Sequence, residues 1–167
     1  KDGRPLAAME CYLAVRRFKV DGGETNVPIR GVEPQSIAIR GADFRILEGR
    51  AFTRGTDEVV VGKKLVDRIA NCQIGDTIQL TVPGGDSVPL EVQAISDDLT
   101  LLGVFTITRN TYAEVIPELL DIQVFGTIED DAELATVLTK VDEAISETPA
   151  MEVLDRDGFI GALVDQI

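Results

Sequence analysis

The chain has 167 residues, of which 44% are apolar but only 5% aromatic, and it contains no Trp; a chain of this length can fold around an aliphatic core without a metal or a disulfide. Its 29 acidic residues outnumber the 16 basic ones and give a net charge of −13, which repels nucleic acid and anionic lipid head groups. Because the chain has no His, the usual serine and cysteine triads, HExxH zinc sites and His-based acid–base catalysis are excluded.

The first predicted elements form a β-hairpin. Residues 6–20 alternate as a long strand, and residues 25–32 form its partner after a glycine-containing turn at residues 21–24. We expect one face of the first strand to carry Met9, Cys11, Leu13 and Val15, and the other face to carry Glu10, Tyr12 and Arg16. Residues 35–47 show no clear period and predict an irregular segment.

Cys11 and Cys72 are the only cysteines. Cys11 lies on the apolar face of the first strand, and Cys72 lies three residues beyond Ile69 on the apolar side of a helix predicted at residues 63–72. Both are therefore expected to point inward. We favour two separate buried thiols, because free Cys is among the most buried residue types. A disulfide between them, formed in an oxidising compartment, is the alternative.

The central part of the chain carries clear strand and turn patterns. Residues 58–62 are typical of a buried strand, and the helix at residues 63–72 follows it directly. Residues 77–82 and 88–95 alternate on either side of Pro-Gly-Gly-Asp, which predicts a second hairpin. The sequence Gly-Asp-Ser-Val-Pro in this region begins like a nucleophile elbow but lacks the closing Gly, so we interpret it as part of the turn.

Residues 96–103 form a predicted loop that we nominate as a partner-contact site. Two acids are followed there by leucines that have neither strand alternation nor helical spacing, and the nominated residues are Asp97, Asp98, Leu99, Leu101 and Leu102. An exposed apolar loop tip suits contact with another protein, and buried packing of the leucines is the alternative. Neither this acidic pair nor the acidic residues 129–131 have EF-hand spacing, so we expect no metal site.

The last part of the chain mixes helices with strands. A strand is predicted at residues 103–108, and Thr111 with Glu114 forms a capping-box pair that starts a short helix. The strands and helices that follow are predicted at residues 120–124, 131–145, 151–154 and 155–167. We therefore predict an α+β fold. It has a mostly β subdomain with hairpins and one short helix at residues 1–108, and an α/β subdomain with a C-terminal βαβα unit at residues 109–167.

Groups that could carry catalysis are scarce. There is no Walker A loop and no GxGxxG, so we expect no cofactor and assign any ATP hydrolysis to another chain. A glycosidase that uses only two carboxylates is the remaining enzyme hypothesis, and a small aliphatic domain without Trp argues against it. No apolar run reaches the roughly 18–20 residues that span a bilayer. The start without Met and the apolar helix at the end favour a piece excised from a longer protein.

A series of short phrases gives the chain a family resemblance. In order they are Gly-Val-Glu-Pro at residues 31–34, Glu-Gly-Arg at 48–50, Val-Val-Val-Gly at 59–62, Gly-Asp-Thr-Ile at 75–78, Leu-Leu-Gly at 101–103, Thr-Tyr-Ala-Glu-Val-Ile-Pro at 111–117 and Asp-Arg-Asp-Gly-Phe-Ile at 155–160. The ordered set resembles the extracytoplasmic core domain of ABC transporter permeases of the MacB and FtsX-like type. The resemblance covers residues 27–167, and family members usually carry a further strand and helix before the region where this chain begins.

The resemblance implies a non-catalytic domain on the extracellular or periplasmic side of the cell membrane, held between membrane helices that flank this chain. Such a domain couples the motion of those helices, driven by a cytoplasmic ATPase subunit, to an outer protein partner or to the export or handling of a lipid, lipoprotein, peptide or drug. It also implies a permease homodimer. A free secreted or cell-surface protein-binding module is the alternative function.

Overall fold

The structure is a computed structural model, and it describes residues 7–51, 53, 56–81, 87–98, 104–116, 121–129 and 131–164. Contacts within the chain divide it into two compact units, Lys1–Gly126 and Thr127–Ile167, which we call the first unit and the second unit. The first unit is built on a β-sheet, and α-helices make up the regular structure described in the second. The α+β fold class predicted from the sequence is confirmed, since the structure combines strands with helices.

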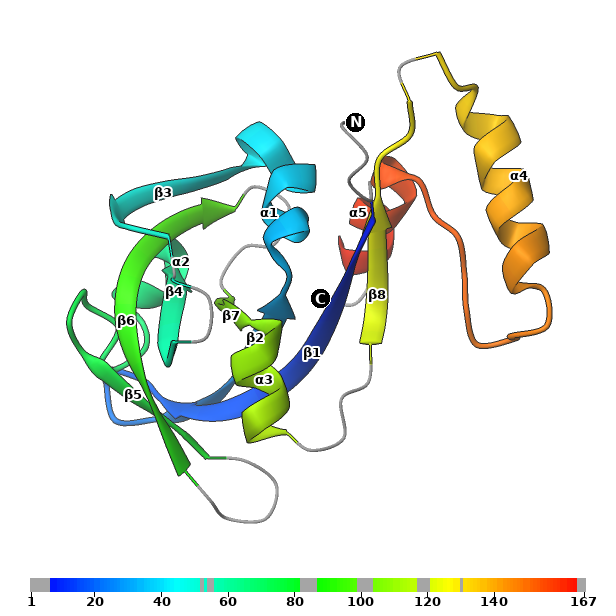
Figure 1. The fold of residues 1–167 in the computed structure, drawn as a ribbon. Coiled ribbons are helices and arrows are strands. Elements are labelled where there is room, and N and C mark those ends of the chain that lie inside the picture. The colour runs from blue at the N-terminus through cyan, green and yellow to red at the C-terminus, as the bar shows by residue number, and fades with distance from the viewer. Residues whose placement is uncertain are drawn as a thin grey trace. The chain divides into compact units, whose positions relative to one another are not determined.

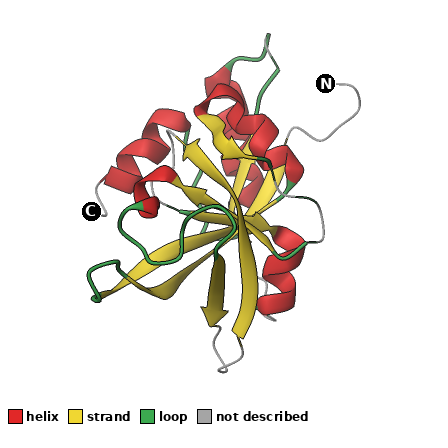
Figure 2. Ribbon diagram, turned by 90° about the vertical axis from the view of Figure 1, so that its left-hand side faces the viewer, coloured by secondary structure: helices red, strands yellow, loops and turns green. Residues whose placement is uncertain are grey.

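The described part of the first unit contains eight strands, coloured from blue to yellow in Figure 1: β1 (Ala7–Phe18), β2 (Glu24–Val32), β3 (Phe44–Gly49), β4 (Glu58–Gly62), β5 (Thr77–Thr81), β6 (Ser87–Asp98), β7 (Phe105–Thr108) and β8 (Asp121–Gly126). Their order is β3-β6-β4-β7-β2-β1-β8, and β5 pairs with β6 outside this path. The β2–β7 and β4–β6 pairs are parallel. The strands fan out with a strong twist in Figure 2. Both predicted hairpins, β1–β2 and β5–β6, are confirmed.

Helix α1 (Pro34–Arg40) and the short 3-10 helix η1 (Gly41–Asp43) precede β3. The prediction that residues 35–47 are irregular is therefore wrong. A helix starts here because Pro34 presets the first turn, and because Glu33 and Ser36 bond reciprocally: Glu33 N donates to Ser36 Oγ at 3.2 Å, and Ser36 N donates to the carbonyl oxygen of Glu33 at 2.9 Å.

Helices α2 (Lys63–Val66) and α3 (Arg109–Val115) differ from their predicted bounds. The predicted helix at residues 63–72 is cut short, and Asn71 has a φ of 59°, a left-handed conformation that no helix continues through. α3 begins before Thr111 because the hydroxyl oxygen of Thr108 accepts a hydrogen bond from Thr111 N at 3.1 Å and caps the helix. The sequence predicts residues 109–126 as part of the α/β subdomain. In the structure, α3 packs on β2 and β7, and β8 pairs with β1.

An aliphatic core covers one face of the sheet. Its buried members come from β1, β2, β4 to β7, the helices α2 and α3 and the segment after α2: Cys11, Val15, Val27, Ile29, Val59, Val61, Leu65, Ile69, Cys72, Ile78, Leu80, Leu90, Val92, Ile95, Phe105, Ile107 and Tyr112. A smaller cluster of Phe44, Val60 and Ala94 forms separately. Val59 and Val61 belong to the main core and Val60 to the smaller cluster, because successive side chains of a strand point to opposite faces.

Strand β1 buries opposite faces in its two halves. Cys11 and Val15 lie in the main core and are 0% and 4% exposed. Nearer the start of the strand, Glu10 on the other face is 1% exposed while Met9 is 41% exposed. The reason is that α1 packs on β1, β2 and β8, and it covers the side that carries Glu10. The prediction that Met9 shares the buried environment of Cys11 is therefore wrong.

The two cysteines both lie in the main core, and no disulfide joins them. Of the two alternatives drawn from the sequence, separate buried thiols are confirmed. Burial raises the pKa of the Cys72 thiol to about 11, so this thiol is neutral at physiological pH.

The second unit contains α4 (Leu134–Ile145) and α5 (Arg156–Val164). Both predicted helices are confirmed, and Asp155 Oδ1 accepts from Gly158 N at 2.8 Å at the start of α5. The predicted strand at residues 151–154 is wrong: these residues join no ladder, and Met151 N instead donates to the carbonyl oxygen of Thr148 in a turn at 3.0 Å. Over the part of the chain that the structure describes, no helix combines the length and apolar character needed to cross a bilayer.

Candidate functional site

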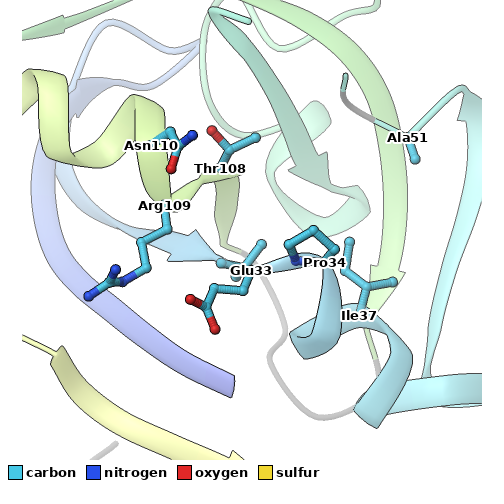
Figure 3. A pocket seen from close by; sticks show the side chains of 8 residues that line it. Glu33, Pro34, Ile37, Ala51, Thr108, Arg109 and Asn110 are labelled. Atoms are coloured by element: carbon cyan, nitrogen blue, oxygen red, sulfur yellow. The ribbon is translucent and has the colours of Figure 1, made fainter. Parts of the chain in front are cut away.

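A cleft lies where β2 and β7, two neighbouring parallel strands, end at the same edge of the sheet. Helix α1 follows β2 and α3 follows β7, so strand ends and helix starts form its walls (Figure 3). Its volume is about 260 Å³, and it is lined by Val32, Glu33, Pro34, Ile37, Ala51, Thr108, Arg109 and Asn110. In α/β sheets ligands bind outside the carboxyl ends of parallel strands, which makes this cleft the candidate binding site.

Hydrogen bonds within the chain hold the walls of the cleft. Thr108 Oγ1 lies 2.8 Å from Thr111 Oγ1, and that hydroxyl donates to the carbonyl oxygen of Thr56 at 3.0 Å. On the other wall, Glu33 Oε2 accepts from Met9 N at 3.3 Å. The Thr108 hydroxyl is therefore used to hold α3 in place, and both walls of the cleft are fixed by bonds within the chain without a ligand.

The lining of the cleft combines apolar and charged groups. In Figure 3 the side chains of Glu33 and Arg109 extend to the same side, while Pro34 and Ile37 lie on the other. Asn110 is exposed and brings an amide that both donates and accepts. An apolar wall with a few polar groups is typical of a binding site. Among the described residues, no group of three or more His, Cys, Asp and Glu side chains could hold a metal ion.

A buried ionic cluster lies on the side of the sheet that α1 covers. It consists of Glu10 (β1), Arg30 (β2), Arg40 (α1), Asp98 (β6) and Phe125 (β8). Arg40 donates to both oxygens of Glu10 at 2.6 and 2.7 Å. Arg30 Nη2 lies 3.2 Å from Glu10 Oε2, and Arg40 Nε lies 3.8 Å from Asp98 Oδ2. Sequence reasoning missed this cluster, because Glu10 alternates as a surface residue would.

The charges of the buried ionic cluster balance, with two guanidinium groups against two carboxylates. The side chains of Glu10 and Arg30 are 1% and 2% exposed. The Phe125 ring centre lies 5.6 and 5.7 Å from the guanidinium carbons of Arg30 and Arg40. Burial lowers the pKa of Arg30 to about 10, with Glu10 opposing the shift, so Arg30 stays charged at neutral pH. Removing one member leaves a buried charge uncompensated, so the cluster holds α1 on the sheet.

The nominated partner-contact residues are only partly described. β6 continues through Asp97 and Asp98, so these acids lie in a strand and not in the expected loop, and they are 4% and 5% exposed. Asp97 Oδ2 accepts from Lys63 Nζ at 2.8 Å and from Arg45 Nη2 at 3.0 Å. These two cations, Lys63 foremost, lower the pKa of Asp97. The leucines of the nominated segment, Leu99, Leu101 and Leu102, lie outside the described residues, and the contact role of the segment stays a prediction.

A comparison with protein families finds a match over most of the chain. Residues 5–155 match the model of the MacB-like periplasmic core domain. The chain belongs to this family. The resemblance drawn from the short phrases, to the core domain of MacB-like permeases, is thereby confirmed. Comparison with curated proteins gives no match.

Two solved structures share the fold of this MacB-like core domain. The periplasmic region of MacB from Actinobacillus actinomycetemcomitans has a TM-score of 0.63 at 14% identity, over 96% of this chain and 76% of that one. The extracellular domain of the noncanonic ABC-type transporter YknZ from Gram-positive bacteria has a TM-score of 0.65 at 13% identity, over 92% of this chain and 83% of that one. At these identities the likeness shows a common fold.

Two of the family-like phrases meet at one ion pair in the core domain. Glu-Gly-Arg covers the end of β3 and Arg50, and Val-Val-Val-Gly follows Glu58 in β4. Arg50 Nη2 donates to Glu58 Oε1 at 2.6 Å, and Thr53 N donates to Glu58 Oε2 at 2.7 Å. The bond from Arg50 is the main reason that the pKa of Glu58 is lowered. The pair therefore ties the segment after β3 to the start of β4.

Proposed function

We propose that this core domain is a non-catalytic coupling element of its permease. It passes the motion of flanking membrane helices, driven by a separate cytoplasmic ATPase subunit, to an outer protein partner that takes part in exporting a lipid, lipoprotein, peptide or drug. The family match over residues 5–155 carries the proposal. On this proposal the domain works at the outer side of the cell membrane and belongs to a permease homodimer.

A rigid first unit supports a coupling role, because a soft body would absorb the motion that it has to transmit. The main core consists of buried, mostly aliphatic side chains from six strands and the neighbouring helices, and protein interiors are close-packed. The buried ionic cluster adds charge-assisted hydrogen bonds between α1 and β1 and an ion pair between β1 and β2. Displacing α1 from the sheet would expose or unpair these charges, so movement of one element is passed to its neighbours.

The cleft at the ends of β2 and β7 favours a protein partner over a whole small molecule at this site. Its volume of about 260 Å³ falls below the roughly 300–1,000 Å³ of sites that enclose drug-sized ligands. One or two side chains from a partner would fill it, with apolar atoms against Pro34 and Ile37 and polar atoms near Asn110. We therefore assign partner contact to this cleft, in addition to the contact role that the sequence predicts for Leu99, Leu101 and Leu102.

The permease assignment is tested by reading the gene on both sides of the 167 codons. We expect an apolar segment of about 20 residues on each side, and co-purification of an ATPase with the full-length protein. A secretion signal before residue 1 and a stop codon soon after residue 167 would instead favour a secreted binding module.

The cleft is tested by filling it in the full-length protein. Asn110→Trp places a large side chain on the exposed cleft side of α3, and Ala113→Trp places the same side chain at another exposed position of that helix. We expect Asn110→Trp to lower export while basal ATP hydrolysis stays unchanged, and Ala113→Trp to leave both unchanged. Normal export by a folded Asn110→Trp protein would rule out partner contact at this cleft.

A further inference from the structure

A second cavity lies in the first unit, beside the edges of two strands. β1 pairs with β2 along one edge, and on its other edge β8 pairs only with residues 7–11. Further along β1, Arg17 Nη1 donates to the carbonyl oxygen of Gln79 in β5 at 2.7 Å. The cavity has a volume of about 480 Å³ and its lining includes Arg16, Arg17 and Phe18 of β1 and Thr77, Gln79 and Thr81 of β5. We call it the Arg17 cavity.

Among the residues that the structure describes, no acidic side chain balances the buried cation in this cavity. Arg17 is 9% exposed, and its Nε makes no hydrogen bond. Within the described ranges, no carboxylate forms an ion pair with it. The neighbouring Cys72 thiol, with a pKa of about 11, is neutral at physiological pH and does not balance the charge. A buried charge without a partner is costly, and this one persists in a chain with 29 acidic residues.

The other walls of the Arg17 cavity suit a small organic molecule. Arg16 brings a second guanidinium, whose partner Glu24 lies 3.5 Å away in an exposed ion pair that exchanges readily with a ligand. Phe18 is 59% exposed and offers an apolar ring face. Thr77 and Thr81 are exposed residues of β5 and add hydroxyl groups that donate and accept. The volume lies within the range of about 300–1,000 Å³ found for small-molecule sites.

We propose that the Arg17 cavity binds a small organic molecule through an oxyanion, either a carboxylate or a phosphate, that pairs with the Arg17 guanidinium. A planar guanidinium matches both groups and forms strong charge-assisted hydrogen bonds with them. The Arg17 guanidinium, whose Nε makes no hydrogen bond within the chain, supplies the charge, and the Phe18 ring packs against the apolar part of the ligand. The net charge of −13 repels long polyanions, which favours a single small anion. This proposal does not depend on the transport function.

The direct test is NMR of the Arg17 Nε–H group in the 167-residue chain, titrated separately with inorganic phosphate, acetate and neutral acetamide up to about 50 mM, since the overall charge weakens anion binding. We expect a saturable shift of the Arg17 resonance with at least one anion and none with acetamide. Saturation with acetate alone identifies a carboxylate ligand, and saturation with phosphate alone identifies a phosphate ligand. No saturable shift with either anion overturns the proposal.

Variants separate the site from general charge effects. Arg16→Gln is an exposed change that we expect to weaken anion binding about two- to fivefold, and Arg17→Gln is expected to weaken it about tenfold or more. Lys140→Gln on α4 removes the same charge at an exposed position outside the lining and should leave the affinity unchanged. If Arg17→Gln does not fold, the wild-type titration and Arg16→Gln decide. Equal weakening by Lys140→Gln and Arg16→Gln would overturn the proposal.

Discussion

Replacing Glu10 with Gln should destabilise the first unit more than any surface charge change. The substitution keeps the shape of the side chain but removes the carboxylate that Arg40 contacts at 2.6 and 2.7 Å and Arg30 at 3.2 Å. Breaking a buried ion pair costs about 3–5 kcal/mol. We expect about 3 kcal/mol, the low end, because Asp98 still lies 3.8 Å from Arg40 and a Gln amide oxygen still accepts one hydrogen bond.

Urea unfolding followed by tyrosine fluorescence measures this loss. Both tyrosines, Tyr12 and Tyr112, lie in the first unit and the chain has no Trp, so the signal reports on that unit. With a slope of about 2 kcal/mol per M, a loss of about 3 kcal/mol lowers the unfolding midpoint by about 1.5 M urea.

The matched control is Glu24→Gln, which removes the exposed ion pair with Arg16 and should cost less than about 1 kcal/mol. A double-mutant cycle with Arg40→Met should show that the two losses, for Glu10→Gln and Arg40→Met, are not additive. If Glu10→Gln costs no more than Glu24→Gln, the buried ionic cluster does not stabilise the fold.

Two further substitutions and one labelling experiment test other features of the first unit. Lys63 lowers the pKa of Asp97. The stabilisation that Asp97 gives is therefore present above the ordinary Asp pKa and is lost as pH falls through its lowered folded-state pKa. Asp97→Asn should flatten the fall of Tm below about pH 4, and an unchanged profile of Tm against pH would contradict this. Because burial raises the pKa of Cys72 to about 11, iodoacetamide at pH 8 should label this thiol in urea but not in the folded chain, as mass spectrometry of the labelled peptide will show. Gly49→Ala puts a Cβ onto the carbonyl oxygen of Gln93 at a φ of +77°, whereas Gly22→Ala at +89° meets open space. Thermal unfolding should show Gly49→Ala to be less stable than Gly22→Ala by at least about 1 kcal/mol, because both variants share the left-handed strain and only Gly49→Ala adds the clash. Equal losses of stability in the two variants would contradict the clash.

Local patterns in the sequence predicted the elements that neighbouring residues determine. The hairpins β1–β2 and β5–β6 follow from alternation around glycine turns, and β4 follows from its unbroken apolar run. The parallel pairing of β2 with β7 could not be predicted in this way, because it joins Ile29 to Phe105 across most of the first unit. The cleft depends on that pairing, so its residues could not be grouped from the sequence.

Burial of charged residues was the other limit of sequence reasoning. Glu10 sits in an alternating strand where a carboxylate normally faces water, and only the packing of α1 shows why it is buried. Arg17 is similar, because the buried state of its side chain depends on the approach of β5. The strand predicted at residues 151–154 failed for a related reason: its alternation is real, but the described structure provides no neighbouring strand for it.

The switch of buried face within β1 also has a consequence for folding kinetics. If β1 slipped by one residue against β2, Glu10 would turn toward the aliphatic side and Cys11 toward α1, so both halves of the strand would be mismatched at once. Misregistered hairpins of this chain should therefore be short-lived, and the refolding of the first unit should lack a slow phase caused by escape from such traps.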